Sequence, residues 1–157
     1  MTEPRPGSSL STSWTALGSV RQVLVALVDA IEGAAHASVL TFEHGEFVSL
    51  VSTQPSLDTM LLGLDSPAGR AFAVGRIVRI PSTHRCNEFP RHAAVLEAFG
   101  LHSLGAFPLR GVRSAVIGVL VVTSYDHHGL GTNDLKTARR TAERLAALIT
   151  DGHTDQP

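Results

Sequence analysis

The chain has 157 residues, a formal net charge of -1 and 43% hydrophobic residues, which suits one folded domain and excludes a largely disordered chain. The net charge argues against a nucleic-acid-binding surface, and the longest basic run is only Arg139-Arg140. The longest apolar run, 115–122, is too short to span a membrane. Cys86 is the only cysteine, so the chain forms no internal disulfide. Residues 1–13 lack the apolar segment of a signal peptide. We therefore expect a soluble cytoplasmic protein that contacts neither nucleic acid nor membrane.

Residues 14–150 carry regular hydrophobic periodicity, and we interpret them as one domain between flexible tails at 1–13 and 151–157. From 14 to 31, apolar residues recur at steps of three and four, which is typical of an amphipathic helix. Gly33 follows as a stop signal. The sequence therefore predicts that the domain opens with a long helix.

A hairpin and a second helix are predicted next. Residues 37–42 and 46–51 are rich in β-forming residues, and His44-Gly45 lies between them at the position of a turn. A helix is expected over 66–75, because its first residues are Ser and Pro and its last is Gly. The apolar residues that follow predict a short strand over 76–80.

The second half repeats this pattern. Residues 82–90 form a polar loop, and a short helix is expected over 92–99. Two strands, 103–109 and 115–124, are joined by a five-residue loop and therefore pair as a second hairpin. A last amphipathic helix is predicted over 132–149, with Thr132 as its cap.

These elements predict an α+β domain with an antiparallel sheet, since consecutive strands are joined by short turns. The two terminal helices are expected to lie together on one face of the sheet. The shorter segments between 64 and 101 are expected to cross the other face, where a pocket would form.

Four stretches in this order resemble the GAF domain family, which is related to the PAS fold. Residues 66–80 resemble its capped helix followed by a strand, and 99–109 its strand that ends in Pro and an aliphatic residue. Residues 117–120 (Ile-Gly-Val-Leu) and 133–135 (Asn-Asp-Leu) match a later strand and the opening of the last helix. The resemblance extends over 14–149.

The resemblance implies a sensory domain that binds cyclic nucleotides, bilins, haem, small anions or metabolites, or that only dimerises. Many GAF domains have an Asp directly after the third strand, where this chain has Pro81-Ser82, so a ligand assignment that depends on that Asp does not transfer. The residues that we expect to line the ligand pocket are Phe72, Arg79, His84, Cys86, Phe89, His92, Leu96, Ser103 and Phe107.

Haem is one alternative ligand. Some GAF sensor kinases hold haem through a His shortly after a Phe-Pro pair, which Phe89-Pro90-Arg91-His92 resembles. His92 is then the candidate axial ligand, and Phe72, Leu96 and Phe107 are expected to enclose the macrocycle. A bound anion is another alternative, since Arg79, Arg85 and Arg91 supply positive charge.

Catalysis is not expected. Free methionine-sulfoxide reductases also have the GAF fold and resolve a cysteine sulfenic acid with further cysteines, whereas this chain has Cys86 alone. His84, Cys86 and His92 match no tight metal-binding spacing, so no metal site is predicted.

We therefore expect a small-molecule-binding regulatory domain that acts in signal transduction through non-covalent contacts. Its predicted partners are an unidentified small molecule, a signalling protein and a second copy of the chain, joined through the helices 14–31 and 132–149. The alternatives are the haem-based gas or redox sensor, and a dimerisation or interaction module without a ligand.

Overall fold

The computed structural model describes residues 14–55, 57, 63–126 and 128–154, so the predicted tail at 1–13 lies outside the described residues. Five strands form one antiparallel sheet in the order β2-β1-β5-β4-β3. The strands are β1 (Ala34–Glu43), β2 (Glu46–Ser52), β3 (Val78–Ile80), β4 (Ser103–Arg110) and β5 (Val116–Ser124). The helices are α1 (Trp14–Ala30), α3 (Pro67–Val74), α4 (Pro90–Ala98) and α5 (Thr132–Thr154), with short 3-10 turns at Thr83–Arg85 and Val112–Ser114. The predicted α+β class and antiparallel sheet are confirmed.

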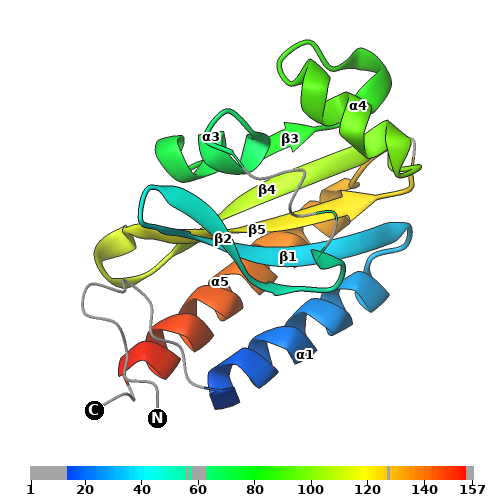
Figure 1. Cartoon of the computed structure of the whole chain (residues 1–157). Coiled ribbons are helices and arrows are strands. Elements are labelled where there is room, and N and C mark those ends of the chain that lie inside the picture. Colours follow the sequence, from blue (N-terminus) through cyan, green and yellow to red (C-terminus); the bar gives the residue numbers. More distant parts are fainter. Residues whose placement is uncertain (1–13, 56, 58–62, 127, 155–157) are drawn as a thin grey trace.

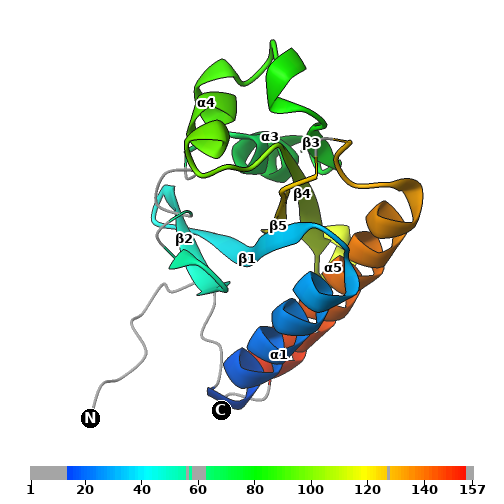
Figure 2. The same cartoon turned by 90° about the vertical axis from the view of Figure 1, so that its right-hand side faces the viewer.

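The helices form layers on the two sides of the sheet. The helices α1 and α5 lie side by side on one face, here called the helical face, and α3 and α4 lie over the other, here called the distal face (Figures 1 and 2). This arrangement is the one predicted. Each face has its own apolar cluster, because successive side chains of a strand point to opposite sides of the sheet.

The apolar stripes of α1 and α5 are buried against the sheet. Leu24 and Leu27 of α1 and Leu145 and Ile149 of α5 are at most 3% exposed. The sheet therefore covers these stripes, and the predicted contact with a second copy through α1 and α5 would use the outer faces of the two helices. Within the described part of the chain, no helix has the length and hydropathy needed to cross a membrane.

The β1–β2 hairpin has the turn that its sequence predicts. His44 and Gly45 both have positive φ, 53° and 84°, as a two-residue type I′ turn requires. Gly accepts this conformation without strain, and the strands pair in one register from Glu43–Glu46 to Leu40–Ser49, where a bulge shifts the pairing.

The cap of α3 is also confirmed. Ser66 Oγ accepts a hydrogen bond from the Gly69 N–H at 3.0 Å, and Gly75 ends the helix with φ 68°. The predicted strand at 76–80 is too long, because the left-handed residue Gly75 turns the chain and β3 begins only at Val78. The helix α4 starts earlier than predicted, at Pro90, since proline suits the first turn of a helix.

The last helix differs from its prediction at both ends. Gly131 and not Thr132 is its cap, since the Leu135 N–H donates to the Gly131 carbonyl at 2.9 Å and Asp134 accepts from the Gly131 N–H at 3.3 Å. The helix continues to Thr154, past the predicted domain boundary at 150. Its sequence from 132 to 154 contains no proline that would interrupt the hydrogen bonds of the helix. The last residues of the predicted tail, 155–157, lie outside the described residues.

Candidate functional site

Four of the predicted pocket residues lie in one apolar cluster on the distal face. Phe72, Cys86, Phe89 and Leu96 come from α3, the segment before α4 and α4 itself, and they pack with residues of β4 and β5. Phe89 is 4% exposed and Leu96 is fully buried. This part of the predicted site is therefore the core of the distal layer, and a ligand that enters it has to move the segments above the sheet.

His92 lies beside this cluster, in the first turn of α4. Its side chain is 8% exposed, and its ring packs edge-on against Phe89 with 6.2 Å between the ring centroids. Burial lowers the pKa of His92; Asp65 opposes this effect and Arg91 adds to it. The site therefore favours the neutral imidazole.

Two predicted pocket residues are on the opposite face. Along β4, Leu104 and Ala106 contribute to the distal cluster and Phe107 and Leu109 to the helical one, so Ser103 also points to the helical side. Phe107 therefore cannot help to enclose a group held by His92, and the predicted haem environment is not assembled as expected. The sequence could have predicted this separation, because alternate residues of a strand face opposite sides of the sheet.

The charged and polar residues of the prediction are dispersed. Arg79 and Arg85 are exposed, and Arg91 forms an ion pair with Asp65. His84 is exposed and stacks on His102, with ring centroids 5.8 Å apart. Among the described residues, no group of three His, Cys, Asp or Glu side chains is placed to hold a metal ion.

A polar row on the distal face was not predicted. His36, Ser38 and Thr123 are fully buried on the two central strands β1 and β5, where His36 is paired with Thr123 and Ser38 with Val121. Thr123 Oγ1 lies 3.3 Å from His36 Nδ1. Ser38 Oγ has no hydrogen-bond partner among the described residues. Polar residues at every second position of an apolar strand were the signal that could have revealed this row.

The segments above the distal face are joined to each other by exposed ion pairs. Arg70 of α3 contacts Glu88 at 2.5 Å, and its guanidinium lies 4.9 Å from the centre of the Phe89 ring. Arg91 of α4 pairs with Asp65, just before α3. Side chains in these pairs are 49–80% exposed, so each pair contributes only about 0–1 kcal/mol. The segments from Asp65 to the end of α4, here called the cover, are therefore held together only weakly by these ion pairs.

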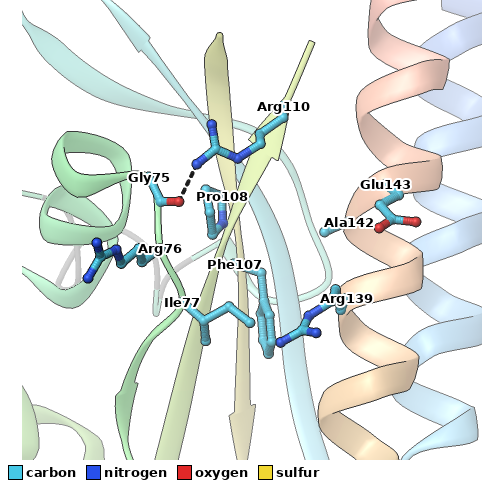
Figure 3. Close-up of a pocket in the computed structure, with 9 residues that line it drawn as sticks. All are labelled: Gly75, Arg76, Ile77, Phe107, Pro108, Arg110, Arg139, Ala142 and Glu143. Atoms are coloured by element: carbon cyan, nitrogen blue, oxygen red, sulfur yellow. Dashed lines mark hydrogen bonds between the residues drawn. The ribbon is translucent and has the colours of Figure 1, made fainter. Parts of the chain in front are cut away.

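A cavity of about 500 Å³ lies away from the predicted site, at the β4 edge of the sheet. It is lined by the residues that follow α3, by the end of β4 and by α5, and it is open to solvent on one side (Figure 3). Its lining residues are Gly75, Arg76, Ile77, Phe107, Pro108, Arg110, Arg139, Ala142 and Glu143. Phe107, predicted for a pocket on the distal face, lines this cavity at the edge instead.

Comparison with solved structures identifies the fold. A GAF domain region from Geobacter sulfurreducens PCA is 16% identical, with a TM-score of 0.75, over 86% of this chain and 93% of that one. The GAF domain of a two-component sensor histidine kinase from Bacillus halodurans is 15% identical, with a TM-score of 0.69, over 90% and 96%. The type II free methionine-R-sulfoxide reductase from Thermoplasma acidophilum is 15% identical, with a TM-score of 0.72, over 88% and 95%.

At these identities the similarity shows the fold alone, and it extends to a domain of a sensor kinase as well as to an enzyme. A search of curated protein sequences finds no match to the chain. The sequence model of the GAF domain matches residues 17–149, which include every strand of the sheet and most of both terminal helices. The chain therefore belongs to the GAF domain family, a common signalling and sensory domain.

Proposed function

We propose that the chain is a regulatory domain that binds a small polar molecule on the distal face, between the sheet and the cover formed by α3 and α4. The observation that carries this proposal is the buried hydroxyl of Ser38. A buried polar group without a partner costs about 1–3 kcal/mol, and a ligand that supplies a hydrogen bond removes that cost. The His36–Thr123 pair beside it gives the ligand further polar atoms.

The cover offers a route for entry. The ion pairs at its rim are exposed, so breaking them costs little free energy, and the main cost of opening is the apolar contact of residues such as Phe89 and Leu96. The signal then passes through the sheet. Ser38 belongs to β1, whose neighbouring residues Ala37 and Val39 pack under α1 and α5 on the other face. A ligand that repositions β1 therefore changes the packing of both terminal helices.

A regulatory function agrees better with the cysteine content than catalysis like that of the reductase relative. Sulfoxide reduction that leaves a cysteine sulfenic acid needs a second thiol to resolve it, and Cys86 is the only cysteine of this chain. The Cys86 Sγ accepts a hydrogen bond from the Phe89 N–H at 3.3 Å, which is a structural contact within the cover.

The test is a thermal-shift screen of the whole chain with nucleotides, metabolites and anions. A compound at 100 times its Kd should raise the Tm by about 5–10 °C. Ser38→Ala should weaken that compound about two- to tenfold, because it removes one neutral hydrogen bond. Ser103→Ala is the matched control, since it removes a buried unpaired hydroxyl from the helical face. If no compound raises the Tm, or if Ser38→Ala leaves affinity unchanged, the proposal is wrong.

A homodimer or interaction module is the second candidate. On α1, Trp14 is 89% exposed and Val25 is 48% exposed, although Arg21, Gln22 and Asp29 surround Val25 with polar groups. These outward residues, and not the buried stripe, would form the contact with a second copy or a signalling protein.

The haem hypothesis stays a prediction. The neutral imidazole of His92 suits iron, but the placement of Phe107 removes one wall of the expected pocket. Absorption spectroscopy after incubation with haem decides it, because a His-ligated haem gives a shifted Soret band that His92→Ala abolishes.

A further inference from the structure

The cavity at the β4 edge exists because β3 is short. The residues Val78–Ile80 pair only with the stretch of β4 from Leu104 to Ala106. Beyond Ala106, β4 continues along β5 as far as Arg110. The side of β4 that β3 leaves open faces a cavity of about 500 Å³, within the usual range for small-molecule sites.

The floor and the rim of this cavity differ in chemistry. Phe107, Pro108, Ile77 and Ala142 supply apolar surface, and Phe107 is 1% exposed and therefore fixed by the core behind it. Pro108 has no N–H to donate, so this edge is a poor template for an added peptide strand. The floor thus favours a compact apolar group over an extended backbone.

The rim is positively charged. Arg76, Arg110 and Arg139 line the cavity with a single carboxylate, that of Glu143. Arg110 donates hydrogen bonds to the carbonyls of Gly75 and, at 2.8 Å, of Ser114. These neutral partners fix the position of Arg110 and leave its charge uncompensated.

Arg139 is the second cationic group of the rim. Its side chain extends from α5 toward the Phe107 ring (Figure 3). Among the described residues, neither Arg139 nor Arg76 forms an ion pair with a carboxylate. The guanidinium of Arg139 is therefore available for an ion pair with a ligand beside the apolar floor. A carboxylate can accept two parallel hydrogen bonds from it in a bidentate pair.

We propose that this cavity binds a small organic monocarboxylate, whose apolar body lies on Phe107 and Pro108 and whose carboxylate pairs with Arg139. The site is separate from the polar row around Ser38, which lies on the distal face. A ligand here contacts both β4 and α5, so it ties the last helix to the edge of the sheet. This binding site is independent of the proposed function and can exist without it.

The test uses benzoate, phenylacetate and hexanoate as probes, with benzamide as the neutral isostere of benzoate. Binding is followed by NMR titration of the isotope-labelled whole chain, in which resonances of β4 and α5 residues are expected to shift. At least one carboxylate should bind, benzamide should bind about tenfold more weakly than benzoate, and added salt should reduce the carboxylate affinity.

The variants separate this site from a general surface effect. Arg139→Gln should weaken carboxylate binding about tenfold. Arg140→Gln removes the adjacent exposed arginine of the same helix, which does not line the cavity, and should change the affinity less than twofold. Both variants are expected to keep the melting temperature of the parent chain. The proposal is overturned if none of the three carboxylates binds, if benzamide equals benzoate, or if both variants lose affinity equally.

Discussion

Gly69 occupies a position in α3 that no other residue can fill without displacement. A Cβ added there would lie 2.3 Å from the carbonyl oxygen of Leu64, which belongs to the backbone and cannot rotate away. Gly69→Ala should therefore destabilise the domain by about 1–3 kcal/mol, in spite of the better helix propensity of alanine. Urea unfolding at constant pH measures this change.

Gly18 is the matched control for that substitution. It lies in α1, and a Cβ added there meets nothing within 4 Å. Gly18→Ala should stabilise the protein by about 0.5–1 kcal/mol, because alanine restricts the unfolded chain and favours the helix. Equal destabilisation by the two substitutions would contradict the close approach of α3 to the 63–64 segment.

The contribution of His92 to the stability of the fold depends on pH. Burial lowers the pKa of His92 in the folded state below its usual value of about 6.5. Above that pH the imidazole is neutral in both the folded and the unfolded state, so no charge is buried and the free energy of unfolding is not reduced. As the pH falls below about 6.5, the unfolded state takes up the proton first, so stability is lost until the folded-state pKa is passed.

His92→Asn should therefore reduce the loss of stability between pH 7.5 and pH 5, measured as the free energy of unfolding in urea at each pH. His128→Asn is the control, because His128 is exposed and its replacement also removes one histidine. A pH dependence that His92→Asn leaves unchanged would show that protonation of another group dominates.

At the scale of elements, a substitution in the turn of the β1–β2 hairpin is expected to stabilise the protein. His44 has a φ of 53°, in the left-handed region that most side chains avoid and that Asn tolerates better. His44→Asn creates the Asn-Gly pair favoured in type I′ turns, so we expect a gain of a few tenths of a kcal/mol up to about 1 kcal/mol. Thermal unfolding measures it. His44→Val should lower the Tm, since a β-branched residue is strained at positive φ.

For the whole molecule, the open question of assembly has a direct test. If the chain is a homodimer through the outer face of α1, light scattering coupled to size-exclusion chromatography should give twice the monomer mass. Val25→Glu, at a position 48% exposed in the monomer, should then give the monomer mass without lowering the Tm of the monomer. A monomeric parent chain at every concentration would exclude this interface.

The sequence predicted the order of elements well, because their signals are local. The apolar steps of α1, the His44-Gly45 turn and the Ser66 cap each lie within a few neighbouring residues. The faces of β4 were predicted less well: Phe107 was placed with Leu96, although odd and even positions of the strand face different layers.

The edge cavity could not be predicted from local signals. The strand expected over 76–80 would have covered more of β4, whereas the turn at Gly75 delays β3 until Val78. How far one strand overlaps another depends on tertiary pairing, and the approach of Arg139 from α5 depends on a helix far along the chain. The polar row at Ser38 could be predicted in part. The alternation of polar and apolar residues is visible in the sequence, but the burial of the polar side chains is not.

The strand order has a consequence for how the protein is made. β1 pairs with β5, so that His36 lies opposite Thr123, and α1 packs beside α5. A ribosome that adds about 5–20 residues per second needs about 5–20 s to pass from the end of α1 to the start of α5. Throughout this interval the apolar stripe of α1, including Leu24 and Leu27, has no finished partner layer. Nascent chains of this protein are therefore expected to expose the apolar face of α1 until α5 has been synthesised, and apolar surface exposed in this way favours aggregation.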